Sequence, residues 1–324
     1  RDVIADPIGL SADGVLGAAV ARTRELHLFR SDGQNLAGGS PKAQLAVPSE
    51  VDELVSSSLT FAEQWLFVVG EAGDRRQLLR APADGSAGLS AVTLPDSEEQ
   101  PPSYISDQLA VSGDGGRLAL RAGAGPSAHD IYTVDVATAQ AHNITDGPAA
   151  HAARGAVFGR DSARLALSAD GTWVAFVRQE GADELMIAAA DGSAAPVHLT
   201  GPLHFFDDVT RVVNLLFVGD DDLLFMAGTE GSGLDVYRLQ VAAGLLSNVT
   251  AAGSTVQPFD GQGDFIANTA WVAGAWLYYL AETTGGGVRE LRAIDLQSFN
   301  TRTIYGQGWA VDRPGALVAC GSTV

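Results

Sequence analysis

Cysteine is almost absent from this chain of 324 residues, which contains only Cys320. A single thiol excludes an intramolecular disulfide and any zinc or iron–sulfur site built from several cysteines. Cys320 closes the apolar run Ala316–Cys320, so we interpret its side chain as a small buried hydrophobe and not as a nucleophile.

Long apolar runs are also missing. No run approaches the roughly 18–20 residues of a membrane-spanning helix, so we expect no direct membrane insertion by this chain. No charged-then-apolar signal segment follows Arg1, and a processed or trimmed start is expected. An anchor would have to come from a segment outside these residues.

Basic residues are few, with 20 against 39 acidic ones, and the formal net charge is -19. A surface this negative repels phosphate backbones and anionic lipids, which disfavours nucleic acid as a partner. It favours cations or basic protein surfaces, although solubility alone explains the charge equally well.

The motifs of several enzyme classes are absent. The chain has no G-x-S-x-G elbow for a serine-hydrolase nucleophile and no H-E-x-x-H metal motif. It also lacks a P-loop and a G-x-G-x-x-G turn in a strand–helix context. We therefore predict no catalytic residue and no cofactor.

An internal repeat dominates what the chain does contain. Leu167–Gly201 has two strand-sized apolar runs, Trp173–Val177 and Leu185–Ala188. An Asp-Gly pair precedes the first run, another follows the second, and a Leu-Thr-Gly triplet closes the stretch. Related stretches begin near residues 10, 59, 111, 217, 271 and 309.

The period of this repeat predicts the architecture. Turns fall near residues 13, 63, 114, 170, 221, 274 and 313, a spacing of about 50 residues that is typical of four-stranded propeller blades. We predict an all-β fold, a single β-propeller domain over residues 1–324, and prefer it to a pair of β-sandwiches. Seven blades are expected, with six as the alternative, and Arg1–Pro7 would complete the blade begun by Trp309–Cys320. The nearest helical candidate, Glu50–Ser57, could be a single turn before a strand.

The motif of Leu167–Gly201 resembles the repeat of TolB-type β-propellers. That repeat has a Ser-Pro-Asp-Gly turn, a strand ending in Ala-Phe, a second Asp-Gly and a closing Leu-Thr. The matching residues here include Asp170, Phe176, Asp191 and Thr200, with Ala169 in place of the proline. The resemblance implies a bacterial envelope propeller that acts through protein contacts. Similar propellers precede the catalytic domain of prolyl-oligopeptidase-like peptidases, and no catalytic residue carries over.

Two segments that differ between the copies are candidate binding loops. The first places His204, Phe205, Phe206, Asp207 and Asp208 between two repeats, where imidazole and carboxylates could also bind a transition metal. A loop that buries one aromatic ring and leaves both carboxylates in water is the simpler interpretation. The second segment, 96–102, contains Glu98 and Glu99 and could contact a basic partner.

Two further patterns have a structural explanation beside a functional one. Asp220, Asp221 and Asp222 could bind calcium through oxygen ligands, but they align with the turns of the other copies. Asn143-Ile144-Thr145 and Asn248-Val249-Thr250 match the glycosylation acceptor pattern, yet their threonines belong to the closing strand of the repeat. We expect solvated turns in the first case and a coincidental match in the second.

These observations favour a non-enzymatic protein-interaction or scaffold module, in the bacterial periplasm or at the cell surface. Its partners would be proteins, in particular basic surfaces or the subunits of an envelope complex. One alternative is the propeller domain of a prolyl-oligopeptidase-like peptidase, or an enzyme that uses channel residues. Another alternative is a sensor of a small ligand or sugar. The step from fold to function rests on analogy, because propellers host many functions.

Overall fold

The protein is described from a computed structural model. It describes residues 9–11, 14–21, 23–95, 102–125, 128–145, 165–180, 182–198, 211–229, 233–250, 254–255, 270–273, 275–283 and 289–305.

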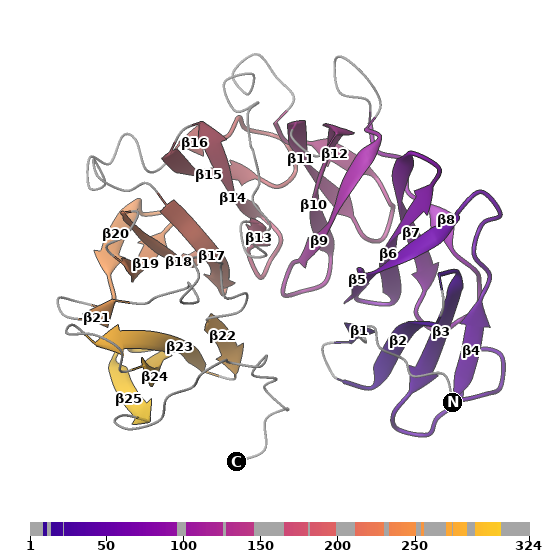
Figure 1. Ribbon diagram of the computed structural model, residues 1–324, viewed down its shortest axis with the longest axis horizontal. Coiled ribbons are helices and arrows are strands. Elements are labelled where there is room, and N and C mark those ends of the chain that lie inside the picture. The colour runs from indigo at the N-terminus through magenta and orange to yellow at the C-terminus, as the bar shows by residue number, and fades with distance from the viewer. Residues whose placement is uncertain are drawn as a thin grey trace. The chain divides into compact units, whose positions relative to one another are not determined.

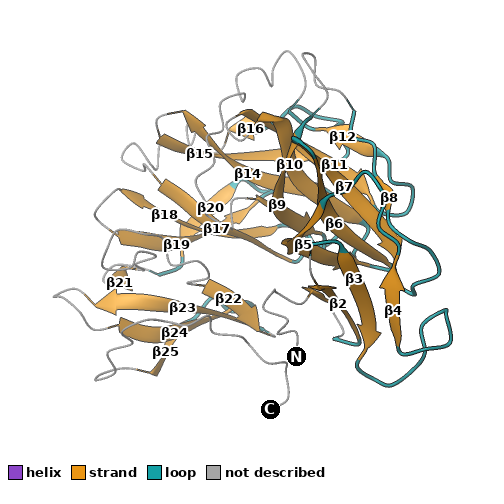
Figure 2. Cartoon of the chain, turned by 45° about the vertical axis from the view of Figure 1, so that its right-hand side comes forward, coloured by secondary structure: helices purple, strands orange, loops and turns teal. Residues whose placement is uncertain are grey.

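Every regular element in this part of the chain is a β-strand, and Figure 2 shows strands and connecting loops with no helix among them. Accordingly, no described segment forms a helix that is long and apolar enough to cross a membrane. The prediction of an all-β fold is therefore confirmed for the described residues.

The strands form six antiparallel sheets, which follow one another along the chain (Figure 1). The first three sheets are β1–β4 (Gly9–Leu10, Leu16–Ala21, Glu25–Arg30, Lys42–Leu45), β5–β8 (Glu53–Ala62, Trp65–Ala72, Arg75–Pro82, Ser90–Ala91) and β9–β12 (Tyr104–Val111, Arg117–Gly125, Ala128–Asp135, Ala141–Asn143). The next two are β13–β16 (Leu165–Leu167, Trp173–Glu180, Ala182–Ala189, Val197–His198) and β17–β20 (Arg211–Val218, Asp222–Thr229, Gly233–Gln240, Leu245–Asn248). The sixth contains β21–β25 (Ser254–Thr255, Ala270–Ala273, Trp276–Thr283, Arg289–Asp295, Thr301–Tyr305).

Each of the first five sheets is a meander in which every strand pairs with the next strand in sequence. The turn between the first and second strands falls at each of the first six predicted positions, from the turn before Leu16 to the turn before Trp276. The repeat period is thus confirmed over these six sheets. The seventh predicted turn, near residue 313, and the closing segments Arg1–Pro7 and Trp309–Cys320 lie outside the described residues.

Two compact units make up the chain. Unit 1 contains Arg1–Val157, Leu165–Val174 and Ile187–Val197, whereas unit 2 contains Phe158–Arg164, Ala175–Met186 and His198–Val324. The first three sheets therefore belong to unit 1 and the last two to unit 2, while the strands of the fourth sheet are shared between the units. A single domain over residues 1–324 stays a prediction.

The core of unit 1 lies between neighbouring sheets. Leu66–Val69 of β6 is fully buried at every position, and successive strand residues face opposite sides, so both faces of this sheet are covered. Leu66 and Val68 pack with side chains of the first sheet, while Phe67 and Val69 pack with the third. This arrangement, in which each sheet buries its faces against its neighbours, is the one that propeller blades use.

The fifth and sixth sheets, both in unit 2, share a core of the same kind. Val213, Leu224 and Met226 of the fifth sheet pack with Leu277 and Tyr279 of the sixth.

The first strands of the unit 1 sheets lie beside one another: β1 contacts β5, β5 contacts β9, and β9 contacts β13 (Figure 1). The outermost strands β4, β8 and β12 lie at the other edge of their sheets. Glu53–Ser57 belongs to β5, so the idea of a helical turn across Glu50–Ser57 is wrong for this part. Its serines belong to a strand because β5 pairs with β6 on both sides of them.

Candidate functional site

The Asp-Gly turns of the repeat are closed by their own side chains. In the third sheet, the Ser112 hydroxyl donates to Asp114 Oδ1 at 2.6 Å. In the fourth, the Ser168 hydroxyl donates to Asp170 Oδ1 at 2.7 Å. Partial burial raises the pKa of Asp170, but hydrogen bonds from Thr172 and Ser168 outweigh it, so this pKa lies below its usual value. These carboxylates stabilise turns, as the repeat predicts.

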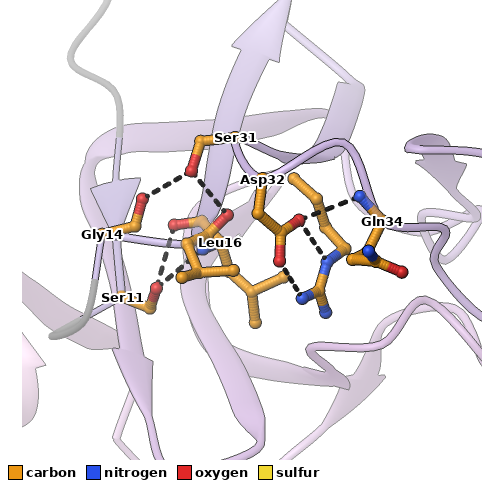
Figure 3. Close-up of polar contacts among 8 residues, drawn as sticks. Ser11, Gly14, Leu16, Ser31, Asp32 and Gln34 are labelled. Carbon is orange, nitrogen blue, oxygen red and sulfur yellow. Dashed lines mark hydrogen bonds and ion pairs between the residues drawn. The ribbon is translucent and has the colours of Figure 1, made fainter.

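Figure 3 shows the matching turns of the first sheet. The Ser11 hydroxyl accepts from the Leu16 amide at 2.8 Å, as the serines of the other copies do in their own turns. In the next turn, Asp32 accepts from the Arg30 guanidinium at 2.6 Å and from the Gln34 amide at 3.0 Å. The hydrogen bond from Arg30 is the main reason that the pKa of Asp32 is lowered to about 2.

The two apparent glycosylation motifs form one recurring network. Asp130, on the third strand of its sheet, accepts from the side-chain amide of Asn143 at 3.1 Å and from the Thr145 hydroxyl at 3.0 Å. The Thr145 hydroxyl also accepts from the Ile131 amide at 3.1 Å. The fifth sheet repeats these contacts at the equivalent positions with Asp235, Asn248 and Thr250. The asparagine and threonine therefore fix the fourth strand to the third, which supports the structural interpretation.

The calcium candidates lie in the turn that leads into β18. Asp222 forms a bidentate ion pair with Arg238, with both N–O distances at 2.8 Å. Asp221 Oδ1 accepts from the Ala242 amide at 2.6 Å. No group of three or more potential metal ligands occurs among the described residues. Asp221 and Asp222 thus have protein partners. The calcium interpretation for Asp220, Asp221 and Asp222 stays a prediction.

The candidate residues of both binding loops, 204–208 and 96–101, lie outside the described residues. Glu98 and Glu99 fall between β8 and β9, and 204–208 falls between β16 and β17. Both segments therefore connect the fourth strand of one sheet to the first strand of the next. Their roles stay predictions.

An open pocket of about 310 Å³ lies beside the outermost strand of the first sheet, and it is lined by Arg24, Gln44, Leu45, Ala46 and Val47. The Arg24 guanidinium donates to the Pro48 carbonyl at 3.2 Å, so part of its hydrogen-bonding capacity holds the connection to the next sheet.

Interruptions of the first strands are the feature that the repeat does not explain. The pairing of β5 with β6 shifts between Val55 and Thr60, and that of β17 with β18 shifts between Val213 and Leu216. In β9 the shift spans 106–108, opposite Arg121. In the sixth sheet, β21 and β22 both pair with β23 and are separated by 256–269. The same region of the first strand is thus bulged in three sheets.

The bulges of β5 and β9, both in unit 1, are polar and in contact. The exposed Ser57 hydroxyl donates to Asp107 Oδ2 at 3.0 Å. Gln108 accepts through Oε1 from the Arg121 guanidinium. Asp107 and Gln108 are half-buried, and Arg121 is buried. We name Ser57, Asp107, Gln108 and Arg121 the inner-strand cluster.

Bulges redirect side chains and are over-represented next to functional sites. The inner-strand cluster is therefore the candidate site among the described residues, and the sequence prediction missed it. Its signal was the polar runs 56–58 and 106–108 inside otherwise apolar strands.

Comparisons with known proteins identify the fold. No family model matches the chain, and no curated protein matches it. Among solved structures, a puromycin-hydrolysing peptidase of Mycobacterium tuberculosis is 14% identical, with a TM-score of 0.54 over 93% of this chain and 44% of the peptidase. Oligogalacturonate lyase from Vibrio parahaemolyticus is 11% identical, with a TM-score of 0.53 over 94% of this chain and 78% of the lyase.

TolB from Acinetobacter baumannii is also matched, at 14% identity and a TM-score of 0.43 over 93% of this chain and 68% of TolB. The peptidase and the lyase are propeller proteins, so the β-propeller fold suspected from the TolB-type repeat is confirmed. At such identities the likeness concerns the fold alone. The chain spans less than half the length of the peptidase that it matches.

Proposed function

We propose that this chain is a non-enzymatic β-propeller module that binds protein partners within a bacterial cell-envelope assembly, in the periplasm or at the cell surface. Its blades would number seven, or six in the alternative, with the ring closed by strands from both ends of the chain. The rigid sheets would hold the binding segments, as scaffolds with functional loops do.

One observation carries this proposal. The repeated aspartates, serines, asparagines and threonines are occupied in turns and strand closures, as Asp114, Asp130 and Asp235 illustrate. The polar groups that break the repeat lie instead in the bulges of the first strands. Specificity therefore belongs where the copies differ, and these residues are suited to hydrogen-bonded recognition. The net charge of -19 favours a partner with a basic surface.

A pull-down tests this function. The tagged full-length protein, expressed in its native bacterium, is cross-linked reversibly and purified from the membrane fraction. We expect one partner in near-stoichiometric amount, and we expect high salt to release it because exposed charges are screened. Glu98→Gln with Glu99→Gln should weaken recovery, whereas Glu50→Gln with Glu53→Gln, an equal charge change at exposed positions, should not. Recovery of the protein alone under all conditions contradicts the proposal.

A peptidase propeller is the second candidate, favoured by one observation. The chain is matched over 93% of its length to only 44% of a puromycin-hydrolysing peptidase. If the native gene product carries a serine-hydrolase domain, a fluorophosphonate probe should label it, and preincubation with an active-site inhibitor should prevent labelling. Labelling would replace the non-enzymatic proposal by this one.

A further inference from the structure

The outermost strand of the first sheet, β4, has an edge that no strand covers. β4 pairs with β3 alone, and the Arg30 amide donates to the carbonyl of Pro41, the residue just before β4. In an antiparallel pair, positions that bond to the partner strand alternate with positions whose backbone groups point away from it. Counted from Pro41, the amides and carbonyls of Lys42, Gln44 and Ala46 therefore point away from β3.

Only part of this edge is bonded. The Lys42 amide donates to the Ser40 hydroxyl at 3.2 Å, and the Ala46 carbonyl accepts from the Leu89 amide at 2.9 Å. Within the described part of the chain, no hydrogen bond is made by either backbone group of Gln44, the Lys42 carbonyl or the Ala46 amide. All three residues are exposed, so a further extended chain can pair with β4.

The side chains along this edge carry positive charge. Lys42 is exposed, is the only lysine of the chain, and forms no ion pair with any described residue. Arg24 lines the open pocket beside 44–47, and none of the residues that line this pocket is acidic. The Glu25 carboxylate on β3 lies 3.8 Å from the His27 imidazole. The edge of β4 thus favours a negatively charged partner, although the net charge of the chain is -19.

The lysine also restricts which strand can pair. A lysine on an edge strand discourages pairing with apolar strands. It favours a strand with a carboxylate directly opposite, because facing cross-strand residues of opposite charge attract. A second copy of this chain does not supply that carboxylate. In a two-fold antiparallel pairing centred on Gln44, Lys42 of each copy would face Ala46 of the other, and two chains of this net charge repel.

We propose that β4 binds an extended acidic peptide segment of a partner protein, which adds to the first sheet as a fifth strand by antiparallel pairing. Main-chain hydrogen bonds to Gln44 and its neighbours provide the affinity, and a glutamate or aspartate opposite Lys42 provides the specificity. The proposal does not depend on the partner with a basic surface proposed above, because the two surfaces need partners of opposite charge and either can fail alone.

The probe is a short peptide of alternating threonine and valine that carries one glutamate and is blocked at both ends. Binding to the full chain is followed by NMR titration and calorimetry, and we expect a Kd on the order of millimolar. The peptide has no amine, so a carbodiimide can join its glutamate to Lys42 or to the N-terminal amine of the chain. Mass spectrometry should locate the new amide bond at Lys42. The same peptide with glutamine for glutamate should bind about tenfold more weakly.

Two variants separate the main-chain contribution from the charge. Gln44→Pro removes an outward amide and leaves the bonds to β3 intact, as prolines on edge strands do. Lys42→Glu reverses the charge and keeps the backbone. Both should melt close to the wild-type temperature, because neither removes a hydrogen bond between strands. Each should weaken binding about tenfold or more, and Gln44→Pro should reduce coupling at Lys42.

The controls make the same changes elsewhere in unit 1. Ala91→Pro removes an outward amide from β8, and Arg75→Glu reverses a charge at an exposed position. Both should bind the peptide normally. Absence of saturable binding, or coupling confined to the N-terminal amine, overturns the proposal and leaves Lys42 as a guard against pairing. Binding that both β4 variants retain also overturns it, as does self-association that Gln44→Pro abolishes, which would assign the edge to a second copy.

Discussion

The joint between the second and third sheets differs from the joint between the fourth and fifth in the charge of one side chain. Arg76 of β7 donates to the Ile105 carbonyl of β9 at 3.2 Å. Asp183 of β15 accepts from the Val212 amide of β17 at 2.9 Å. Arg76 and Asp183 occupy equivalent positions on the third strands of their sheets. Each lies seven residues before an alanine, Ala83 or Ala190, whose amide donates to the carbonyl of the residue just before the second strand.

The difference shows what such a joint requires. The first strand of a sheet offers a carbonyl and an amide at its edge, and either one can be bonded from the preceding sheet. An arginine serves the carbonyl and an aspartate serves the amide, so a side chain of opposite charge preserves the contact. The requirement is a partner for the backbone, and for this reason the sequence can drift between copies without loss of the fold.

A second contact is also varied between copies. Arg80 donates to the Val136 carbonyl at 3.0 Å, and Thr133, at the same place in the next sheet, donates to the Ala190 carbonyl at 2.5 Å. At the equivalent place in unit 2, the Arg238 guanidinium lies 3.9 Å from the centre of the Phe299 ring. Hydrogen bonding and cation–π stacking thus serve at one position of the repeat.

Removal of the buried carboxylate should have the largest effect. Asp183 is 3% exposed, and Asp183→Ala leaves the Val212 amide without its acceptor. We expect a loss of about 3 kcal/mol in the free energy of unfolding, measured with urea. Asp183→Asn, which keeps an oxygen, should lose less. Arg76→Ala, at the half-buried position, should cost about 1 kcal/mol. Equal costs for Asp183→Ala and Arg76→Ala would contradict the comparison.

The next-largest loss of stability should come from a glycine in the turn between β9 and β10. Gly115 has a φ of 76°, and an added Cβ would lie 2.8 Å from the Glu63 amide nitrogen of the neighbouring sheet. Gly14 has a φ of 68° but open space around its Cβ position. We expect Gly115→Ala to cost about 2 kcal/mol and Gly14→Ala about 1 kcal/mol, by thermal unfolding. The same loss at both sites would show that sheet contact adds nothing to backbone strain.

The threonine networks should behave alike in the two units. Thr145→Val and Thr250→Val each remove the acceptor of a third-strand amide and a donor to an aspartate. Each should therefore cost about 1–2 kcal/mol in urea unfolding. A difference of more than about 1 kcal/mol between them would show that the shared network does not work equally in both units.

The smallest effect on stability should come from the protonation of a single turn aspartate at low pH. Hydrogen bonds from Ser193 lower the pKa of Asp191 below its usual value. The unfolded state therefore binds protons first, and the stability contributed by this residue is lost as the pH falls below about 4. In urea titrations between pH 5 and 2, Asp191→Asn should show a shallower loss of stability than the wild-type protein. An unchanged slope would contradict the role of this carboxylate.

The sequence predicted the sheets because their signals are local. A glycine at positive φ, such as Gly171, and a serine two residues before an aspartate are visible in one copy and recur at the repeat period. The apolar runs supplied the strands, and the period supplied their grouping. The stretch Glu50–Ser57 was partly misjudged, since Ser57 and its neighbouring serines have little strand propensity.

The candidate site could not be predicted in the same way. A bulge is defined by the register of two strands, and one strand alone does not show that Asp107 lies opposite Arg121. The contact of Ser57 with Asp107 joins residues that are 50 positions apart. The joints pose the same difficulty, because Arg76 and Asp183 have no chemical likeness that a repeat search would align.

Hydrogen exchange at the Val212 amide tests most directly the claim that side chains at one repeat position join neighbouring sheets. In the wild-type protein this amide should be protected nearly as well as the core amides of β18, since Val212 is fully buried and its amide donates to Asp183. Asp183→Ala should raise its exchange rate by about tenfold or more, and Asp183→Asn should largely restore protection. Exchange of the wild-type amide at the rate of an exposed one, or protection unchanged in Asp183→Ala, would contradict the account.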